Sequence, residues 1–116
     1  MSRELEMAKL ACRALDEKKG KDIKVIDIHE VSVIADYFVI ASASNQNQVQ
    51  AMVDNVDETL GRAGFEAKQI EGTRNSSWVL MDYGDMIVHV FDEENRLFYD
   101  LERIWRDGKE IQVEEL

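Results

Sequence analysis

The sequence WVLMDYGDMIVHVF at residues 78–91 gives the clearest indication of the fold, and the rest of the chain is interpreted around it. Two apolar runs, 78–81 and 86–91, flank the polar tetrad DYGD at 82–85, and this arrangement predicts a β-hairpin. Gly84 supplies the positive φ that so tight a connection needs. Neither run alternates cleanly between apolar and polar residues, so the strands should be covered on both faces, or on one face and by a partner. The hairpin is therefore expected at the centre of a sheet.

The residues on either side of the hairpin follow the periods of helices and strands. Apolar residues recur at three- and four-residue steps over 4–18 and again from 49 to 63, which predicts two amphipathic helices. The second helix has Ser44 or Asn45 as its N-cap. Short apolar runs at 23–28, 36–41 and 65–70 predict three further strands.

The chain after the hairpin is expected to form a last helix and a tail. Asp92 is placed to cap this helix, whose buried side would hold Leu97, Leu101, Ile104 and Trp105. Residues 107–116 are expected to form a polar, acidic C-terminal extension that frays. The order is helix, two strands, helix, three strands, helix, which we interpret as an α/β fold with five strands in one sheet flanked by helices.

Length and composition indicate one ordered domain over residues 1–116, since the chain contains no proline and no low-complexity window. The N-terminus lacks the apolar core of a signal peptide, and no apolar run approaches membrane-spanning length. We therefore expect a cytoplasmic protein without a membrane partner. The single cysteine, Cys12, cannot form an internal disulfide, and its place on the apolar side of the first helix favours a buried hydrophobe over a reactive thiol.

Charge is unevenly distributed along the chain. The net charge is -10, from 24 acidic and 14 basic residues, and residues 65–116 hold thirteen acidic and six basic groups. This balance argues against direct, unassisted nucleic-acid binding, because the affinity for nucleic acids comes mainly from Lys and Arg on phosphates. It favours a basic partner surface, while a role in solubility alone stays open.

Catalytic and metal-binding patterns are weak. Ser42-Ala43-Ser44-Asn45 contains no glycine and matches no phosphate-binding fingerprint, so a helix cap is favoured over a phosphate cradle. Asp82 and Asp85 could bind a divalent cation, but they lie across a turn, where aspartate is common for its local hydrogen bonds, so a turn role is favoured over a metal role. His89 lies within an apolar strand, which favours a neutral, hydrogen-bonded core histidine over a catalytic base. We expect no catalytic residue, no metal and no cofactor.

A partner-binding surface is better supported than chemistry. Large adaptable apolar groups stand beside carboxylates around the hairpin, which is the make-up of an interface with a basic partner. The residues concerned are Glu71, Trp78, Met81, Asp82, Tyr83 and Asp85. For Trp78 and Met81, a simple core role remains an equal alternative.

The assembled motifs resemble the Iojap family, the ribosomal silencing factors called RsfS, over almost the whole chain. The matching residues are DYFVIA at 36–41, Gln48-Val49, Glu71-Gly72, WVL at 78–80, DYGD at 82–85, VHVF at 88–91, and Arg96, Tyr99, Leu101-Glu102 and Trp105. The chain departs from the family pattern at Ala43, where glycine is common, and at Asn45, where serine is usual. Both changes keep a helix cap and weaken the case for a phosphate site.

The resemblance implies a mixed sheet related to the nucleotidyltransferases but without their catalytic acids and phosphate loop. It also implies a translation repressor that binds the large ribosomal subunit through its protein uL fourteen and sterically prevents the small subunit from joining when nutrients are scarce. On this basis Trp78 and Met81 are expected to anchor the partner, Glu71, Asp82 and Asp85 to face Lys or Arg groups, and Tyr83 to pack at the rim.

Two other classes of protein stay open. One is a nucleotidyltransferase-like protein that binds a nucleotide near residues 42–45. The other is a structural homodimer in which the apolar face of the hairpin pairs with itself.

Overall fold

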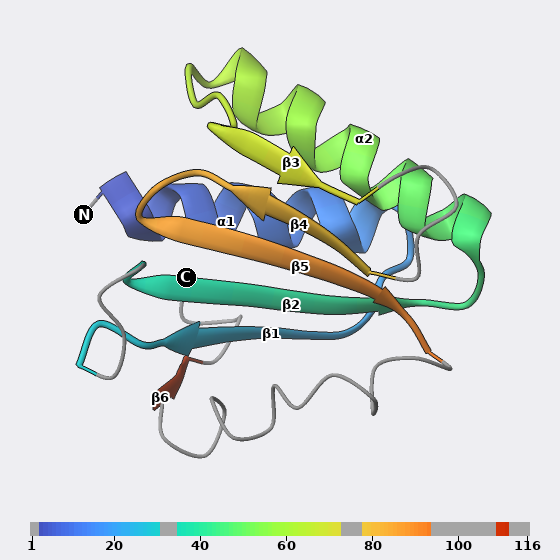
Figure 1. The fold of residues 1–116 in the computed structure, drawn as a ribbon, viewed down its shortest axis with the longest axis horizontal. Helices are drawn as coiled ribbons and strands as arrows, with labels where there is room; N and C mark the ends of the chain where they lie inside the picture. Colours follow the sequence, from blue (N-terminus) through green and yellow to red (C-terminus); the bar gives the residue numbers. More distant parts are fainter. Residues whose placement is uncertain (1–2, 31–34, 73–77, 94–108, 112–116) are drawn as a thin grey trace.

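The structure is a computed structural model that describes residues 3–30, 35–72, 78–93 and 109–111 (Figure 1). Its helices are α1 (Arg3–Glu17) and α2 (Gln46–Arg62). Its strands are β1 (Lys21–Asp27), β2 (Tyr37–Ala43), β3 (Gln69–Glu71), β4 (Trp78–Asp82), β5 (Met86–Asp92) and β6 (Lys109–Ile111). No helix in these ranges is long and apolar enough to cross a membrane.

The strands form one mixed sheet in the order β3-β4-β5-β2-β1-β6. β2 and β5 are parallel neighbours, and the other pairs are antiparallel. The predicted hairpin is confirmed as β4 and β5, which run from the pair Trp78 and Phe91 to the pair Asp82 and Ile87. Tyr83 N–H donates to the Met86 carbonyl over 2.9 Å to close the turn, and Gly84 has the expected positive φ of 89°. The mixed α/β fold expected from the sequence is thus confirmed.

Apolar residues pack on both faces of the sheet, which explains why the hairpin sequence does not alternate. One face lies under α1 and α2, and its buried cluster includes Leu15, Val39, Met52, Val88 and Val90. We call the opposite face the far face. Its cluster consists of Ile26, Ile28, Ala35, Phe38, Ile40, Ile87 and Phe91. Every residue of β5 is buried, as expected for a strand in the middle of the sheet.

The N-terminal half follows the sequence expectations closely. α1 begins and ends within a residue of the predicted bounds. Cys12 is buried, and this burial raises the pKa of its thiol to about 12, so the thiol is un-ionised at neutral pH. Asn45 caps α2, because its side chain accepts a hydrogen bond from Gln48 N–H over 2.8 Å.

The structure differs from the expectation at both edges of the sheet. The strand predicted over 65–70 is reduced to β3 (Gln69–Glu71), because only these residues pair with β4. Lys109–Ile111, expected to belong to a polar extension, instead forms β6 and pairs with β1, which adds a sixth strand to the five predicted. Three residues with a single apolar side chain carry too little pattern to predict a strand. The last helix, predicted after Asp92, lies outside the described residues.

Candidate partner-binding site

The alternation of side chains along β4 divides the predicted site between the two faces of the sheet. Trp78, Leu80 and Asp82 are half-buried on the far face, while Val79 and Met81 are buried under the helices. Glu71 pairs directly with Leu80 across the β3–β4 ladder, so its side chain lies on the far face as well. The structure therefore brings together Glu71, Trp78, Leu80 and Asp82, which we call the far-face site.

Met81 and Tyr83 lie on the other side of the sheet. Met81 is 0% exposed and Tyr83 is 6% exposed, and both belong to the cluster beneath the helices. Side chains buried to this degree cannot contact a partner in this conformation, so the expected anchoring by Met81 and rim packing by Tyr83 are not met here. Burial, with the nearby Asp57 carboxylate, raises the pKa of Tyr83. Its hydroxyl is buried and has no hydrogen-bond partner in the described part of the chain.

The two carboxylates of the hairpin turn have different surroundings. Asp82 accepts a hydrogen bond from Gly84 N–H over 2.7 Å, which is the turn role expected from the sequence. The Asp85 side chain is exposed, while its backbone carbonyl accepts from Asp36 N–H (2.8 Å) and Tyr37 N–H (3.1 Å). The hairpin tip is thus tied to the start of β2. Among the described residues, no three His, Cys, Asp or Glu side chains are grouped so as to hold a metal ion.

Trp78 is held by two neighbours on β5. Its indole stacks on Phe91 at 5.4 Å between ring centroids, and its Nε1–H donates to His89 Nδ1 over 3.1 Å. His89 is 3% exposed, and burial lowers its pKa to about 4. The expected neutral core histidine is therefore present, and among the described residues one of its two ring nitrogens is hydrogen-bonded. His89 Nε2 is buried without a partner among the residues that the structure describes.

Leu80 is the site residue that the sequence reasoning missed. Its side chain is half-buried, packs against the far-face cluster and stands between Trp78 and Asp82 on β4. The signal was present in the two-residue spacing 78, 80, 82, which places these side chains on one side of any strand. The sequence prediction counted acidic and apolar residues without using that spacing, so it grouped residues from both faces of the sheet.

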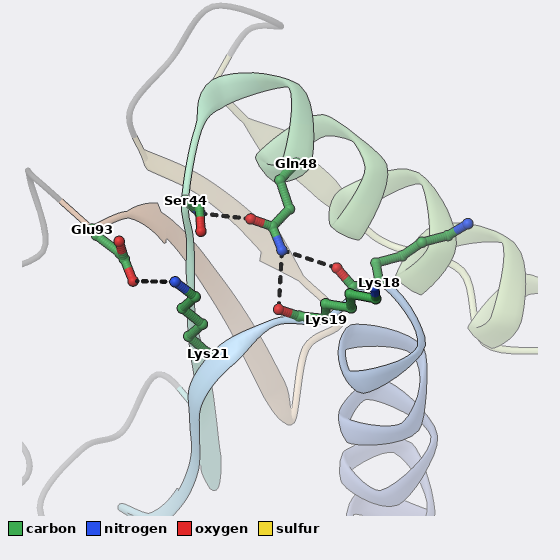
Figure 2. A network of polar contacts seen from close by, with 6 residues as sticks. All are labelled: Lys18, Lys19, Lys21, Ser44, Gln48 and Glu93. Atoms are coloured by element: carbon green, nitrogen blue, oxygen red, sulfur yellow. Dashed lines mark hydrogen bonds and ion pairs between the residues drawn. The ribbon is translucent and has the colours of Figure 1, made fainter.

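The possible phosphate cradle after β2 is filled by the chain itself (Figure 2). The Gln48 side chain accepts a hydrogen bond from Ser44 N–H over 2.6 Å and donates to the carbonyls of Lys18 and Lys19, each over 3.0 Å. Gln48 N–H is used by the Asn45 cap. Two of the backbone donors that an anion would need at a helix N-terminus are therefore engaged. This arrangement favours the helix-cap interpretation.

Comparisons with known proteins identify the family of this chain. A family model described as "Ribosomal silencing factor during starvation" matches residues 2–116. The ribosomal silencing factor RsfS of Bacillus subtilis is 38% identical over 100 residues, covering 86% of this chain and 85% of that protein. The RsfS of Halalkalibacterium halodurans is 36% identical over 109 residues, covering 94% and 93%. The crystal structure of a Chromobacterium violaceum protein superimposes with a TM-score of 0.85 at 35% identity, covering 90% of this chain and 88% of that one. The chain belongs to the ribosomal silencing factor family, RsfS, which its motifs resemble.

Proposed function

We propose that this protein binds the large ribosomal subunit in the cytoplasm through protein uL fourteen and sterically blocks joining of the small subunit, which represses translation when nutrients are limiting. Membership of a family named for ribosome silencing during starvation supports this function. The observation that carries the choice of surface is the far-face site. It combines half-buried apolar side chains with carboxylates on one side of a hairpin.

The far-face site has the composition that suits a basic protein surface. Trp78 and Leu80 provide apolar area on the far face, and Glu71 is exposed beside them. Asp82 continues the same row on β4, and Asp85 is exposed at the hairpin tip. Carboxylates around an apolar centre attract Lys and Arg groups and accelerate association, while desolvated contacts at the centre slow dissociation.

Met81 and Tyr83 have an indirect role in this proposal. Both side chains pack beneath the helices, directly behind the strand and turn that carry Trp78, Leu80 and Asp82. They set the position of β4 against α2 and do not touch the partner. Their substitution should therefore affect folding before it affects binding.

The test is co-sedimentation of the purified protein with separated large and small ribosomal subunits. We expect binding to the large subunit alone, and we expect Trp78→Ala and Asp82→Lys to weaken it. Asp54→Lys is the matched control, because it reverses a charge on the exposed side of α2, away from the far-face site. Binding to neither subunit would overturn the proposal. A loss of binding in Asp54→Lys equal to that in Asp82→Lys would show that net charge alone controls association.

Protein uL fourteen is tested separately from the subunit. Purified uL fourteen should bind the wild-type protein and should compete with large subunits for it. An excess of the wild-type silencing factor should also reduce the formation of complete ribosomes from purified subunits, whereas an excess of its Trp78→Ala variant should not.

Sedimentation of the silencing factor alone decides whether it forms a homodimer. A dimer broken by Trp78→Ala would mean that the far face is shared between self-association and subunit binding.

A further inference from the structure

The hydrogen bond between Trp78 and His89 runs diagonally across the hairpin. In the β4–β5 ladder, Trp78 is opposite Phe91, and His89 is opposite Leu80. The indole must therefore lean along the sheet to place Nε1 at 3.1 Å from His89 Nδ1. This diagonal reach is within the range of long aromatic side chains in antiparallel sheets. The contact thus requires a particular rotamer of each side chain.

Ring packing and the hydrogen bond fix different properties of the indole. Stacking of Trp78 on Phe91, with 22° between the ring planes, sets the plane of the indole. An indole turned over within that plane would keep the stacking, but its N–H would no longer point at His89 Nδ1. The hydrogen bond to Nδ1 selects one of these two orientations. His89 is itself held by Phe38 on β2, whose ring meets it edge-on at 4.6 Å.

His89 accepts this bond only in one protonation state. An imidazole nitrogen accepts a hydrogen bond when it is unprotonated, so the proton of the neutral ring is on Nε2. Nε2 is buried and lacks a hydrogen-bond partner among the described residues. A phenylalanine would fill similar space without a buried ring N–H that lacks a partner among the described residues. The acceptor at Nδ1 is therefore the property by which histidine differs usefully from an apolar residue at this position.

We propose that His89 is a positioning residue for partner binding, which fixes through its Nδ1 the orientation in which Trp78 meets the large ribosomal subunit. This inference rests on the proposed function, because it concerns the same far-face site. His89 acts through Trp78 and does not itself touch the partner. It couples the buried centre of the sheet, from Phe38 on β2 to His89 on β5, to the aromatic residue at the start of β4.

The first measurement is the indole resonance of Trp78 in proton–nitrogen correlation spectra of the full chain. The chain has two tryptophans, so the Trp78 signal is assigned by its loss in Trp78→Phe. In His89→Phe this signal should move upfield and exchange faster with solvent, because the acceptor is gone. His89→Asn should restore much of the shift, since Asn Oδ1 takes the place of Nδ1. An indole signal unchanged in folded His89→Phe would overturn the inference.

The second measurement is affinity for large subunits in a double-mutant cycle. His89→Phe should weaken binding by roughly 3- to 10-fold. In the Trp78→Phe background the same change should weaken binding by less than about twofold, because the donor that His89 orients is absent. A general structural role would give an equal loss in both backgrounds and would overturn the inference. Failure of His89→Asn to recover binding would do the same.

Folding and function are separated by further controls. Circular dichroism establishes that each variant is folded. If His89→Phe does not fold, His89→Gln replaces it, because the carbonyl of Gln lies farther along the side chain than Nδ1 of His and does not take its place as the acceptor. If the wild-type protein does not bind large subunits, the proposed function fails and the binding role of His89 fails with it. The indole signal would still show whether the hydrogen bond exists. The two failures are therefore distinguishable.

Discussion

Glu71 and Leu80 lie directly opposite each other in the β3–β4 ladder, which places an exposed carboxylate beside the apolar row of β4 on the far face of the sheet. Nine positions separate these residues in the sequence. Their pairing makes a single surface from residues that composition alone cannot assign to one side. It also makes the contribution of charge to binding testable, one residue at a time.

Reversal of the charge at this edge should slow association with the large subunit. We expect Glu71→Lys to reduce the association rate roughly 5- to 10-fold at low salt, because rim charges act mainly by steering. The difference from wild type should shrink as the salt concentration rises. Binding kinetics on an immobilised protein at two salt concentrations measure this, with Asp54→Lys as the control. An effect of Glu71→Lys that does not depend on salt would contradict steering.

Neighbouring apolar residues on β4 should have opposite phenotypes. Leu80→Ala should weaken subunit binding with a small effect on stability, since its side chain is half-buried on the far face. Met81→Ala should lower the free energy of unfolding by about 2–5 kcal/mol and leave binding by the folded fraction near wild type, because Met81 is fully buried. Urea unfolding and subunit binding, measured on both variants, check the pair. The reverse assignment would mean that β4 presents its other face.

The free energy of unfolding should decrease as the pH is lowered from about 6.5 to about 4, partly because of His89. Burial lowers its pKa from 6.5 to about 4, so the unfolded chain binds a proton in this range that the folded chain excludes. The stabilisation from the neutral ring is complete above pH 6.5 and is lost as the pH falls to about 4, a total of roughly 3 kcal/mol.

The variant His89→Phe isolates this contribution. It should flatten the pH dependence of the unfolding free energy in that window, and carboxylates that titrate nearby cancel in the difference from wild type. His29 is unchanged in the comparison. It is exposed, and the Asp27 carboxylate raises its pKa, so its own contribution is present at low pH and is lost as the pH rises. An equal slope in wild type and His89→Phe would show that folding does not lower the pKa of His89.

The Gln48 side chain should stabilise the junction of α1 and α2 without affecting binding. Gln48→Ala removes its bonds to Ser44 N–H and to the carbonyls of Lys18 and Lys19, and we expect a loss of about 1–2 kcal/mol in unfolding free energy. Gln48→Glu keeps the acceptor for Ser44 but sets a carboxylate against two carbonyls, so it should be less stable than Gln48→Ala. Thermal unfolding orders the two variants. Nucleotide uptake by the wild-type protein in calorimetry would contradict the helix-cap assignment.

Two glycines should respond to alanine in opposite ways. Gly61→Ala should stabilise the protein by about 0.5–1 kcal/mol, since Gly61 is helical and an added Cβ meets nothing within 4 Å. Gly72 has a φ of +109°, and a Cβ there would lie 2.7 Å from the Trp78 carbonyl oxygen. Gly72→Ala should therefore destabilise the β3–β4 edge and weaken subunit binding. Equal melting temperatures for the two variants would refute this contrast.

Local signals in the sequence predicted much of the fold. The α1 and α2 periodicities, the Asn45 cap and the hairpin around Gly84 depend on residues a few positions apart, and the structure has them as expected. The core positions of β5 were also predictable, because a continuous apolar run needs cover on both faces.

The acidic and apolar character of the site was also predicted from the sequence, but its division between the two faces of the sheet was not. Composition grouped Trp78 with Met81 and Asp82 with Tyr83. The structure separates them, because residues an odd number of positions apart along β4 point to opposite sides of the sheet, and Tyr83, just after β4, packs beneath the helices.

Short-range periodicity and turn chemistry were sufficient to predict the helices, the hairpin and the residue types that the site offers. Three other features are set by tertiary contacts: β3 is three residues long, Lys109–Ile111 pairs with β1, and Trp78 donates to His89. Each of these depends on backbone or side-chain groups that come from another strand. The physical reason is that a strand's hydrogen-bond partners and its buried face are set by its neighbours in the sheet, which the strand's own sequence does not specify.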